Sequence, residues 1–344
     1  MKIGSLFSGY GGLDLAVEAI TGAQPAWFCE FDTAPSKVLA HHWPDVPNHR
    51  DVTAIDWREV EPVDILTGGS PCQDLSQAGK RAGMTEGTRS NLWVNMREAI
   101  NHLRPQLVVW ENVQGALSAP ATSDSDMEPA TGLLGNTGGG HLRALGRVLG
   151  DLTEIGYDAE WTTLRASDVG APHHRARIFL IAWPRHAHTQ RDDGGQGPRQ
   201  PSGGTQAQRP TTTSRPEHSS SAPTNPERVG RHGRGTAPQQ TSGAQSPTDR
   251  LRPGNSSVEW GKYAPAIRRW ERVLGVAAPN PTEPNTKGNP RLAAPFAEWM
   301  MGLPPGWVTN PEIGLTRAQQ LKALGNGVVP AQAQAALTHL LERR

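Results

Sequence analysis

The chain has 344 residues, 35% of them hydrophobic, and a formal net charge of +1. Its two cysteines, Cys29 and Cys72, are too few for a disulfide framework or a cysteine-rich metal site. No apolar run approaches the roughly 18 residues that a membrane span needs, and the start, MKIGSLFSGYGG, reaches glycines too early for a signal peptide. We therefore expect a soluble protein of a reducing cytoplasm, with a buried core and some chain outside it.

Short apolar runs alternate with helix-like segments over the first 115 residues. The runs, which predict strands buried on both faces, cover residues 2–7, 26–31, 63–67 and 107–110. Between them, apolar residues recur at three and four positions over residues 13–20, 34–43 and 91–103. This order predicts an α/β fold, with a mainly parallel sheet, helices on both faces, and ligands at the carboxyl ends of the strands.

The rest of the chain mixes packed and polar segments. Residues 118–140 are rich in Ser, Ala, Thr and Gly and predict a surface insert. A helix is predicted over 141–156, followed by strands over 159–166 and 177–183. Residues 186–257 contain no Phe, Trp or Tyr, which predicts a disordered or loosely structured insert.

Order is expected to return near residue 258. Ile267, Trp270 and Leu274 recur at helical spacing, and basic residues lie elsewhere around the same helix. An ordinary docked helix with a solvated basic side is the simpler interpretation of that pattern. Residues 291–308 and 321–341 are apolar enough to join the core.

A glycine loop, SGYGG, follows the first predicted strand and opens a helix. Gly9, Gly11 and Gly12 let the backbone approach a ligand, but the third glycine of the pyrophosphate-binding pattern is missing. Glu30, at the end of the second strand, could bind both hydroxyls of a ribose or simply face water. With Asp51 placed to take an adenine amino group, the pattern indicates an adenosine without phosphates.

Cys72 follows the strand over 63–67, and Glu111 and Asn112 follow the strand over 107–110. Neighbouring strands lie about 4.8 Å apart, so a thiol and a carboxyl would share one pocket. A glycine-rich, polar loop is an unusual place for a spectator thiol and could favour the thiolate, whereas Cys29 lies in an apolar run and is expected to be a spectator. Glu111 could instead cap a helix or form a salt bridge, but a Glu that ends an apolar strand is costly unless it is used.

No metal site and no serine nucleophile are expected. The histidine pairs at 41–42 and 173–174 have no carboxylate at helical spacing, and the chain has no G-x-S-x-G. Thiol chemistry is therefore favoured over both.

The chain contains, in the order and approximate spacing of the DNA cytosine-5 methyltransferases, FSGYGGLDLA, Glu30, Asp51, GGSPCQDLS, ENV, APHHRARIF and LGNGVVP. It resembles a prokaryotic or phage member of that family over about residues 2–184 and 291–343. The resemblance implies the Rossmann-like fold of S-adenosylmethionine-dependent methyltransferases, with a smaller variable target-recognition region. The domains implied are a catalytic, cofactor-binding domain over 1–184, a low-complexity insert over 185–257, the remaining target-recognition region over 258–290, and a segment over 291–344 that returns to the catalytic domain.

The resemblance also implies the site residues. Cys72 would be the nucleophile, Glu111 would contact the ring nitrogen and amine of a cytosine, and Arg177 its carbonyl oxygen. Asn112 and Arg175 would support them, Arg175 through the DNA or the active-site loop. The cofactor S-adenosylmethionine would be held by Phe7, Gly9, Tyr10, Gly11, Gly12, Leu13, Glu30, Phe31, Asp51, Val52, Pro71, Leu92, Asn326 and Val328. Double-stranded DNA would be contacted by Arg175, Lys262, Arg268, Arg269 and Arg272.

The implied activity is methyl transfer to C5 of a flipped-out cytosine in a specific duplex sequence, through a covalent bond between Cys72 and C6. The enzyme would be a monomer of a bacterial or phage-infected cytoplasm, used in restriction-modification, beside a possible cognate endonuclease, or in phage self-protection. One alternative is an RNA cytosine-5 methyltransferase, whose Cys-Phe-Thr tripeptide this chain lacks. The other is a catalytically silent DNA-binding relative, whose expected damage to the Pro-Cys or Glu-Asn-Val loops is missing.

Two positions depart from the family pattern. Ser5 stands where many relatives have an acidic residue, and His173 replaces the usual glutamine ahead of two arginines. Neither departure removes a group to which the resemblance assigns chemistry.

Overall fold

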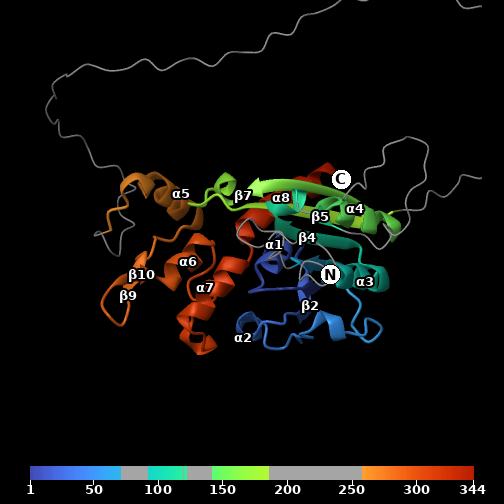
Figure 1. The fold of residues 1–344 in the computed structure, drawn as a ribbon, viewed down its shortest axis with the longest axis horizontal. Helices are drawn as coiled ribbons and strands as arrows, with labels where there is room; N and C mark the ends of the chain where they lie inside the picture. Colours follow the sequence, from blue (N-terminus) through green and yellow to red (C-terminus); the bar gives the residue numbers. More distant parts are fainter. Residues whose placement is uncertain (71–91, 119, 122–141, 186–257) are drawn as a thin grey trace, which may run out of the picture. The chain divides into compact units, whose positions relative to one another are not determined.

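The computed structural model describes residues 1–70, 92–118, 120–121, 142–185 and 258–344 (Figure 1). The chain divides into two compact units, Met1–Ala187 with Gly254–Arg344, and His188–Pro253. The second unit lies outside the described residues, as do nearly all of the inserts predicted over 118–140 and 185–257. The fold below is therefore that of the first unit.

A six-stranded sheet organises this unit, in the order β2-β1-β3-β4-β8-β7. The first four of these strands are parallel, whereas β8 is antiparallel to both of its neighbours. The strands are β1 (Lys2–Leu6), β2 (Gln24–Cys29), β3 (Ile65–Gly68), β4 (Leu107–Val113), β7 (Tyr157–Arg165) and β8 (Ala176–Pro184). The predicted α/β fold with a mainly parallel sheet is confirmed.

Eight α-helices lie within the described residues. They are α1 (Gly12–Thr21), α2 (Thr33–His42), α3 (Trp93–Leu103), α4 (Ala144–Glu154), α5 (Ala264–Leu274), α6 (Ala294–Met300), α7 (Arg317–Asn326) and α8 (Pro330–Arg343). Two strand pairs complete the unit: β5 (Pro120–Ala121) with β6 (Leu142–Arg143), and β9 (Thr282–Pro284) with β10 (Pro290–Leu292). None of the helices in the described ranges is long and apolar enough to cross a membrane.

Helices cover both faces of the sheet, because successive strand residues point to opposite sides. Leu66, Val108 and Leu180 pack with α3 and α4 on one face. Their neighbours Ile65, Val109 and Ile181 pack with α1 and the C-terminal α8 on the other. The unalternating apolar runs of the sequence are the result of this double burial.

A second cluster of apolar side chains joins α5, α6 and α7 to the first part of the chain. Ile267 and Trp270 of α5 are buried in it, Leu274 packs at its margin, and Tyr10 from the glycine loop and Val38 from α2 belong to it as well. The predicted docked helix is thus confirmed. Through this cluster, the C-terminal third of the chain supports the loop between β1 and α1.

The end of β4 differs most from the predicted strand boundaries. β4 continues to Val113, so Glu111 and Asn112 lie inside the strand and pair with Phe179 and Ile178 of β8. The sequence placed them beyond the strand's end because polar residues usually mark that point. The antiparallel neighbour β8 also pairs with the residues that follow Trp110, and this pairing keeps Glu111 and Asn112 in the strand.

Candidate active site at the strand ends

The glycine loop between β1 and α1 exposes its backbone. Phe7, Gly9 and Gly11 have left-handed φ angles of 54°, 57° and 85°. The Phe7 N–H donates to the Cys29 carbonyl of β2 at 2.9 Å, which fixes the start of the loop. A Cβ added to Gly9 would meet no described residue within 4 Å, so among these residues the loop opens on free space at the N-terminus of α1. This geometry allows a ligand to approach the main chain closely.

The Glu30 carboxylate lies beside that loop, after the end of β2. Its Oε2 accepts from the Gly9 N–H at 2.9 Å and its Oε1 from the Asp32 N–H at 2.8 Å. Burial raises the pKa of the Glu30 carboxyl, and the two backbone N–H groups oppose that shift. Because a carboxylate oxygen can accept two hydrogen bonds, each oxygen keeps one position for a ligand hydroxyl.

Three further residues were expected around an adenosine: Phe31, Asp51 and Val52. Phe31 is 68% exposed. Asp51 caps a short 3-10 helix (Val52–Ala54), and its Oδ1 accepts from the Thr53 N–H and hydroxyl at 3.0 and 2.7 Å. These bonds lower the pKa of the Asp51 carboxyl. Val52 is buried in the core cluster against which Phe7 and Leu92 pack.

The C-terminal part of the chain closes the other side of the glycine loop. The hydroxyl of the buried Tyr10 donates to the Val328 carbonyl at 2.6 Å, and a Cβ on Gly327 would overlap the Tyr10 ring. A Cβ on Gly12 would likewise overlap the Val328 carbonyl. Asn326 ends α7 directly before this contact and is exposed. Predicted cofactor residues from both ends of the sequence are therefore adjacent, through contacts that only glycine permits.

An ion pair between the buried Glu111 and the partly buried Arg177 occupies the β4 end of the sheet. The Arg177 Nε lies 2.9 Å from the Glu111 Oε1. Burial is the largest influence on the pKa of the Glu111 carboxyl and raises it, while the charges of Arg177 and Arg175 pull it back. A Cβ added to Gly69 would lie 3.2 Å from the Glu111 Oε2, so the carboxyl faces the chain just before the Pro-Cys turn.

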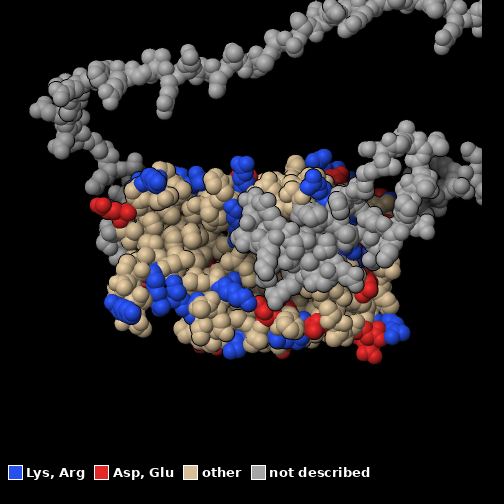
Figure 2. Space-filling view, in the orientation of Figure 1, with Lys and Arg blue, Asp and Glu red and all other residues tan. Residues whose placement is uncertain are grey.

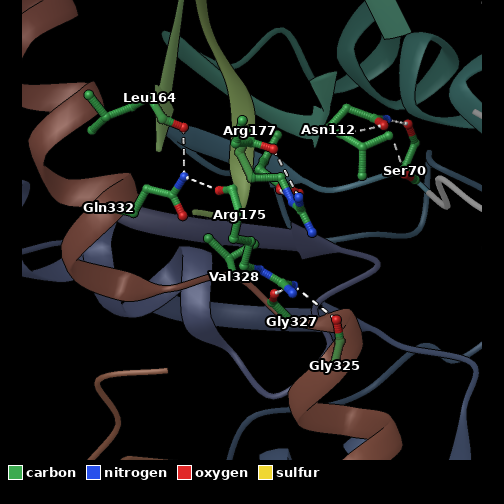
Figure 3. Close-up of polar contacts among 12 residues, drawn as sticks. Ser70, Asn112, Leu164, Arg175, Arg177, Gly325, Gly327, Val328 and Gln332 are labelled. Carbon is green, nitrogen blue, oxygen red and sulfur yellow. Dashed lines mark hydrogen bonds and ion pairs between the residues drawn. The ribbon is translucent and has the colours of Figure 1, made fainter. Parts of the chain in front are cut away.

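Asn112 holds the start of that turn (Figure 3). Its Nδ2 donates to the carbonyl and the Oγ of the buried Ser70 at 3.2 and 3.1 Å, and the Trp110 Nε1 donates to the same Oγ at 3.1 Å. Pro71 and Cys72 lie outside the described residues. The described part of the loop is thus fixed to β4, next to Glu111.

The turn before β8 holds the predicted Arg175. Its side chain extends to the C-terminal wall of the glycine loop, where Nη2 donates to the Gly325 carbonyl at 3.0 Å and to the Gly327 carbonyl (Figure 3). His173, one of the two departures from the family pattern, bonds through Nε2 to the Met300 carbonyl at 3.0 Å. The basic turn is therefore fixed to the C-terminal part of the chain as well as to the sheet.

The basic residues expected to contact DNA lie on and beside α5. Arg268 and Arg272 are exposed, and Lys262 lies 5.3 Å from the centre of the Tyr263 ring. Arg269 also makes a contact within the protein: its Nε donates to the Gly170 carbonyl at 3.1 Å. Figure 2 shows Lys and Arg side chains on this face of the molecule over the part formed by α5, α7 and the β9–β10 pair.

Sequence reasoning missed a buried carboxylate under the glycine loop. Asp14, in the first turn of α1, accepts from the Ser5 Oγ at 2.8 Å and the Thr67 Oγ1 at 2.6 Å. Burial raises the pKa of Asp14 to about 6. The only sign of this buried carboxylate in the sequence was that Asp14 lies among apolar residues in the predicted helix over 13–20. The contact also explains the departure at Ser5, whose hydroxyl serves as a donor to this carboxylate.

Trp307 was missed as well. Its Nε1 donates to the Tyr10 carbonyl at 3.0 Å, and its ring stacks on His42 with the centroids 3.6 Å apart. This contact holds the glycine loop from a segment almost three hundred residues away, and no local pattern in the sequence announces it.

Comparisons with known proteins identify the family of the chain. The model of a family described as C-5 cytosine-specific DNA methylase matches residues 1–342. The type II methyltransferase M1.ScrFI of Lactococcus lactis subsp. cremoris is 30% identical over 54% of this chain and 42% of its own length. A protein of Escherichia phage P1 named DNA N-6-adenine-methyltransferase is 31% identical over 53% of this chain and 28% of its own length. The chain thus spans less than half the length of these relatives.

Among solved structures, the S. pombe Dnmt2 methyltransferase aligns with 100% of this chain and 99% of its own, with a TM-score of 0.54 and 13% identity. At that identity the likeness shows the fold alone.

Proposed function

The chain belongs to the C-5 cytosine-specific DNA methylases, and we propose that it transfers a methyl group from S-adenosylmethionine to C5 of a cytosine in duplex DNA. The observation that carries the proposal is the ion pair between the buried Glu111 and the partly buried Arg177, 2.9 Å apart, beside the chain that leads into the Pro-Cys turn. An acid and a cationic donor thus lie beside Gly69, three residues before Cys72 in the chain.

The described residues fit the cofactor. Gly9 opens on free space, Glu30 keeps an acceptor position on each oxygen for the ribose hydroxyls, and the exposed Phe31 ring is available to an adenine. S-adenosylmethionine would supply an electrophilic methyl group at these strand ends. Asp51, whose Oδ2 makes no hydrogen bond within the described residues, would bind the adenine amine.

The chemistry requires a thiolate and an acid together. Cytosine C5 is a weak nucleophile, so the Cys72 thiolate would first bond to C6 and push electron density toward C5 and N3. Glu111 would donate a proton or hydrogen bond at N3, a general-acid contribution typically worth about 10²–10⁴ in rate. After C5 takes the methyl group, a base removes the C5 proton and the bond between sulfur and C6 breaks.

Arg177 serves this step in two ways. The pair through its Nε fixes the orientation of the Glu111 carboxyl. Its Nη1 donates to the Ala176 carbonyl at 2.9 Å, and its Nη2 would donate to the cytosine carbonyl oxygen. The target atom C6 is inaccessible inside a base stack, so the cytosine would have to rotate out by about 180° into this pocket.

Duplex DNA is the substrate that we propose. The basic side chains on and beside α5, Lys262, Arg268 and Arg272, would contact its backbone or guanine edges, and residues 258–290 would belong to the target-reading region. The monomeric state and a companion endonuclease belong to the same proposal. Light scattering and a cleavage assay on unmodified DNA test these two points.

Sequencing of DNA from a methylation-deficient host that expresses the protein tests the reaction. We expect 5-methylcytosine in one short motif, read by bisulfite conversion or nanopore current. N6-methyladenine, which the name of the phage P1 relative suggests for that protein, would contradict the proposal. Unmodified DNA would favour the catalytically silent alternative, and 5-methylcytosine in RNA alone would favour an RNA substrate.

The two cysteines offer a matched test of the nucleophile. Cys72→Ser should abolish covalent trapping on DNA that contains 5-fluorocytosine, because a hydroxyl is a far weaker nucleophile than a thiolate. Cys29→Ser should still be trapped, because Cys29 is buried in the core and burial raises the pKa of its thiol to about 12. Trapping of the Cys72→Ser variant would remove Cys72 from the mechanism.

A further inference from the structure

Gln332 of α8 is a fully buried amide at the junction of the two halves of the site. Its Nε2 donates to the Leu164 carbonyl of β7 at 2.8 Å and to the Arg175 carbonyl at 2.9 Å (Figure 3). Its Oε1 has no hydrogen-bond partner among the described residues. A buried acceptor without a partner is unfavourable, so the two donated bonds are the reason that this position holds an amide and not an apolar side chain.

The Arg175 peptide that Gln332 grips has an unusual backbone. Arg175 has a φ of 37°, in a region that side-chain-bearing residues rarely adopt. Such a conformation persists only when its surroundings impose it. Here the surroundings are the Gln332 amide on the Arg175 carbonyl and the contacts of the Arg175 side chain with the Gly325 and Gly327 carbonyls.

This one peptide determines where two functional groups point. The Arg175 side chain reaches the wall formed by residues 325–328, against which Tyr10 of the glycine loop is held. Two positions later, the Arg177 side chain meets the Glu111 carboxyl. Arg175 is the residue directly before β8, so a change in its backbone would move its own side chain and the start of the strand that carries Arg177.

We propose that Gln332 is a positioning residue that couples the cofactor wall to the catalytic carboxyl by fixing the Arg175 peptide. The inference rests on the proposed methyl transfer and adds to it a group that touches neither DNA nor cofactor. When the amide holds the turn, Arg175 secures the 325–328 wall and Arg177 orients Glu111. When it does not, both parts loosen together.

The test is Gln332→Met, which keeps the length of the side chain and removes both donors. We expect the affinity for S-adenosylhomocysteine, measured by calorimetry, and kcat on DNA to fall together, each on the order of ten- to hundred-fold, as for a displacement near 1 Å. Gln334→Met, on the exposed side of the same helix, should change neither. If Gln332→Met does not fold, Gln332→Asn, which draws the amide back by one methylene group, replaces it.

A purely structural role is separated by a second control. Leu340→Ala removes a buried side chain from the far end of α8 and should lower the melting temperature at least as much as Gln332→Met. Its Kd for S-adenosylhomocysteine and its kcat per folded molecule should stay at the wild-type values. If Gln332→Met also lowers only the melting temperature, or alters only one of the two constants, the coupling is wrong.

A double-mutant cycle tests whether Gln332 acts on cofactor binding through Arg175. In an Arg175→Met background, Gln332→Met should no longer weaken S-adenosylhomocysteine binding, because the wall has already lost its clamp, yet it should still lower kcat through Arg177. Additive losses in binding would contradict the route through Arg175. Wild-type turnover distinguishes the two proposals: a wild type that methylates no DNA contradicts the proposed function, and an active wild type with an unaffected Gln332→Met contradicts the coupling.

Discussion

The two halves of the proposed site, the cofactor half around Glu30 and the catalytic half around Glu111, hold a buried carboxylate in different ways. Glu30 and Glu111 are each 8% exposed, and burial raises the pKa of both. Glu30 is held by the uncharged N–H groups of Gly9 and Asp32, whereas Glu111 is held by the guanidinium of Arg177. Neutral donors fix an acceptor for neutral ligand hydroxyls. A fixed cation instead stabilises the charged carboxylate that remains after a proton has been given away.

The difference predicts which constant each half controls. Interactions that are equal in the ground state and the transition state change binding, and those that strengthen as charge develops change kcat. The cofactor half should therefore act on affinity and the catalytic half on turnover. Substitutions of the same chemical kind in the two halves measure this directly.

The largest effect should come from Glu111→Gln. The amide cannot give a proton to N3, so we expect single-turnover methyl transfer at saturating cofactor to fall by about 10²–10⁴. Binding of S-adenosylhomocysteine should stay at the wild-type value, because Glu111 belongs to the other half. Rapid-quench measurement of the methylated product gives the rate, and calorimetry gives the affinity.

Glu30→Gln is the counterpart that can break the comparison. Hydrogen bonds to a charged group contribute about 1.5–3 kcal/mol, so the affinity for S-adenosylhomocysteine should fall roughly ten- to hundred-fold. The single-turnover rate at saturation should remain close to that of the wild type. If Glu30→Gln slows the saturated step as much as Glu111→Gln does, the two halves are not separable.

Asp14 shows a third way of holding a buried carboxylate, at the junction of the halves. Its partners are the hydroxyls of Ser5 in β1 and Thr67 in β3, and burial raises its pKa to about 6 from an ordinary 3.8. The folded state thus binds this proton more tightly than the unfolded state. The stabilising contribution is complete below about pH 4 and is lost as the pH rises through about 6.

Asp14→Asn, which is neutral at every pH, isolates that contribution. The free energy of unfolding of the wild type, relative to this variant, should fall by about 3 kcal/mol between pH 4 and pH 8, since one pKa unit corresponds to about 1.4 kcal/mol. Urea unfolding at each pH gives the difference. Asp56→Asn is the control: hydrogen bonds with Arg58 lower the pKa of Asp56 to about 2, so its difference from wild type should be flat over this range. A flat difference for Asp14→Asn would show that its carboxyl keeps an ordinary pKa.

Periodicity predicted the sheet well because each parallel strand is buried on both faces and reads as one apolar run. It ended β4 too early, at Trp110, because the pairing of Glu111 and Asn112 with β8 depends on a strand far away in the sequence. A local pattern contains no information about such a partner.

The sequence indicated the Glu111 and Glu30 positions because polar residues directly after apolar runs are conspicuous. It did not indicate Gln332 or Trp307, because each acts through a main-chain carbonyl more than a hundred residues away. Every residue has a main-chain carbonyl, so the type of residue at the acceptor position gives no sign of the contact. Arg175 was placed in the site by the resemblance, but its contacts with the Gly325 and Gly327 carbonyls could only be read from the structure.

The smallest effect tests whether steric fit alone controls the cofactor half. Gly327 has an ordinary backbone, with φ −78° and ψ 178°, so alanine is not disfavoured there by conformation. Its Cβ would overlap the ring of Tyr10, which is buried and tied through its hydroxyl to Val328. Overpacking of this kind costs about 1–3 kcal/mol, so Gly327→Ala should melt earlier and bind S-adenosylhomocysteine more weakly.

Gly325→Ala is the matched control, because a Cβ there meets no described residue within 4 Å and the residue lies in α7. Replacing a helical glycine by alanine in open space should raise stability by about 0.5–1 kcal/mol and leave binding unchanged. Adding Tyr10→Leu to Gly327→Ala should recover part of the lost melting temperature, because the smaller side chain makes room for the added methyl group. If it recovers none, contact with the ring is not what excludes a side chain at Gly327, and the cofactor half is not controlled by fit.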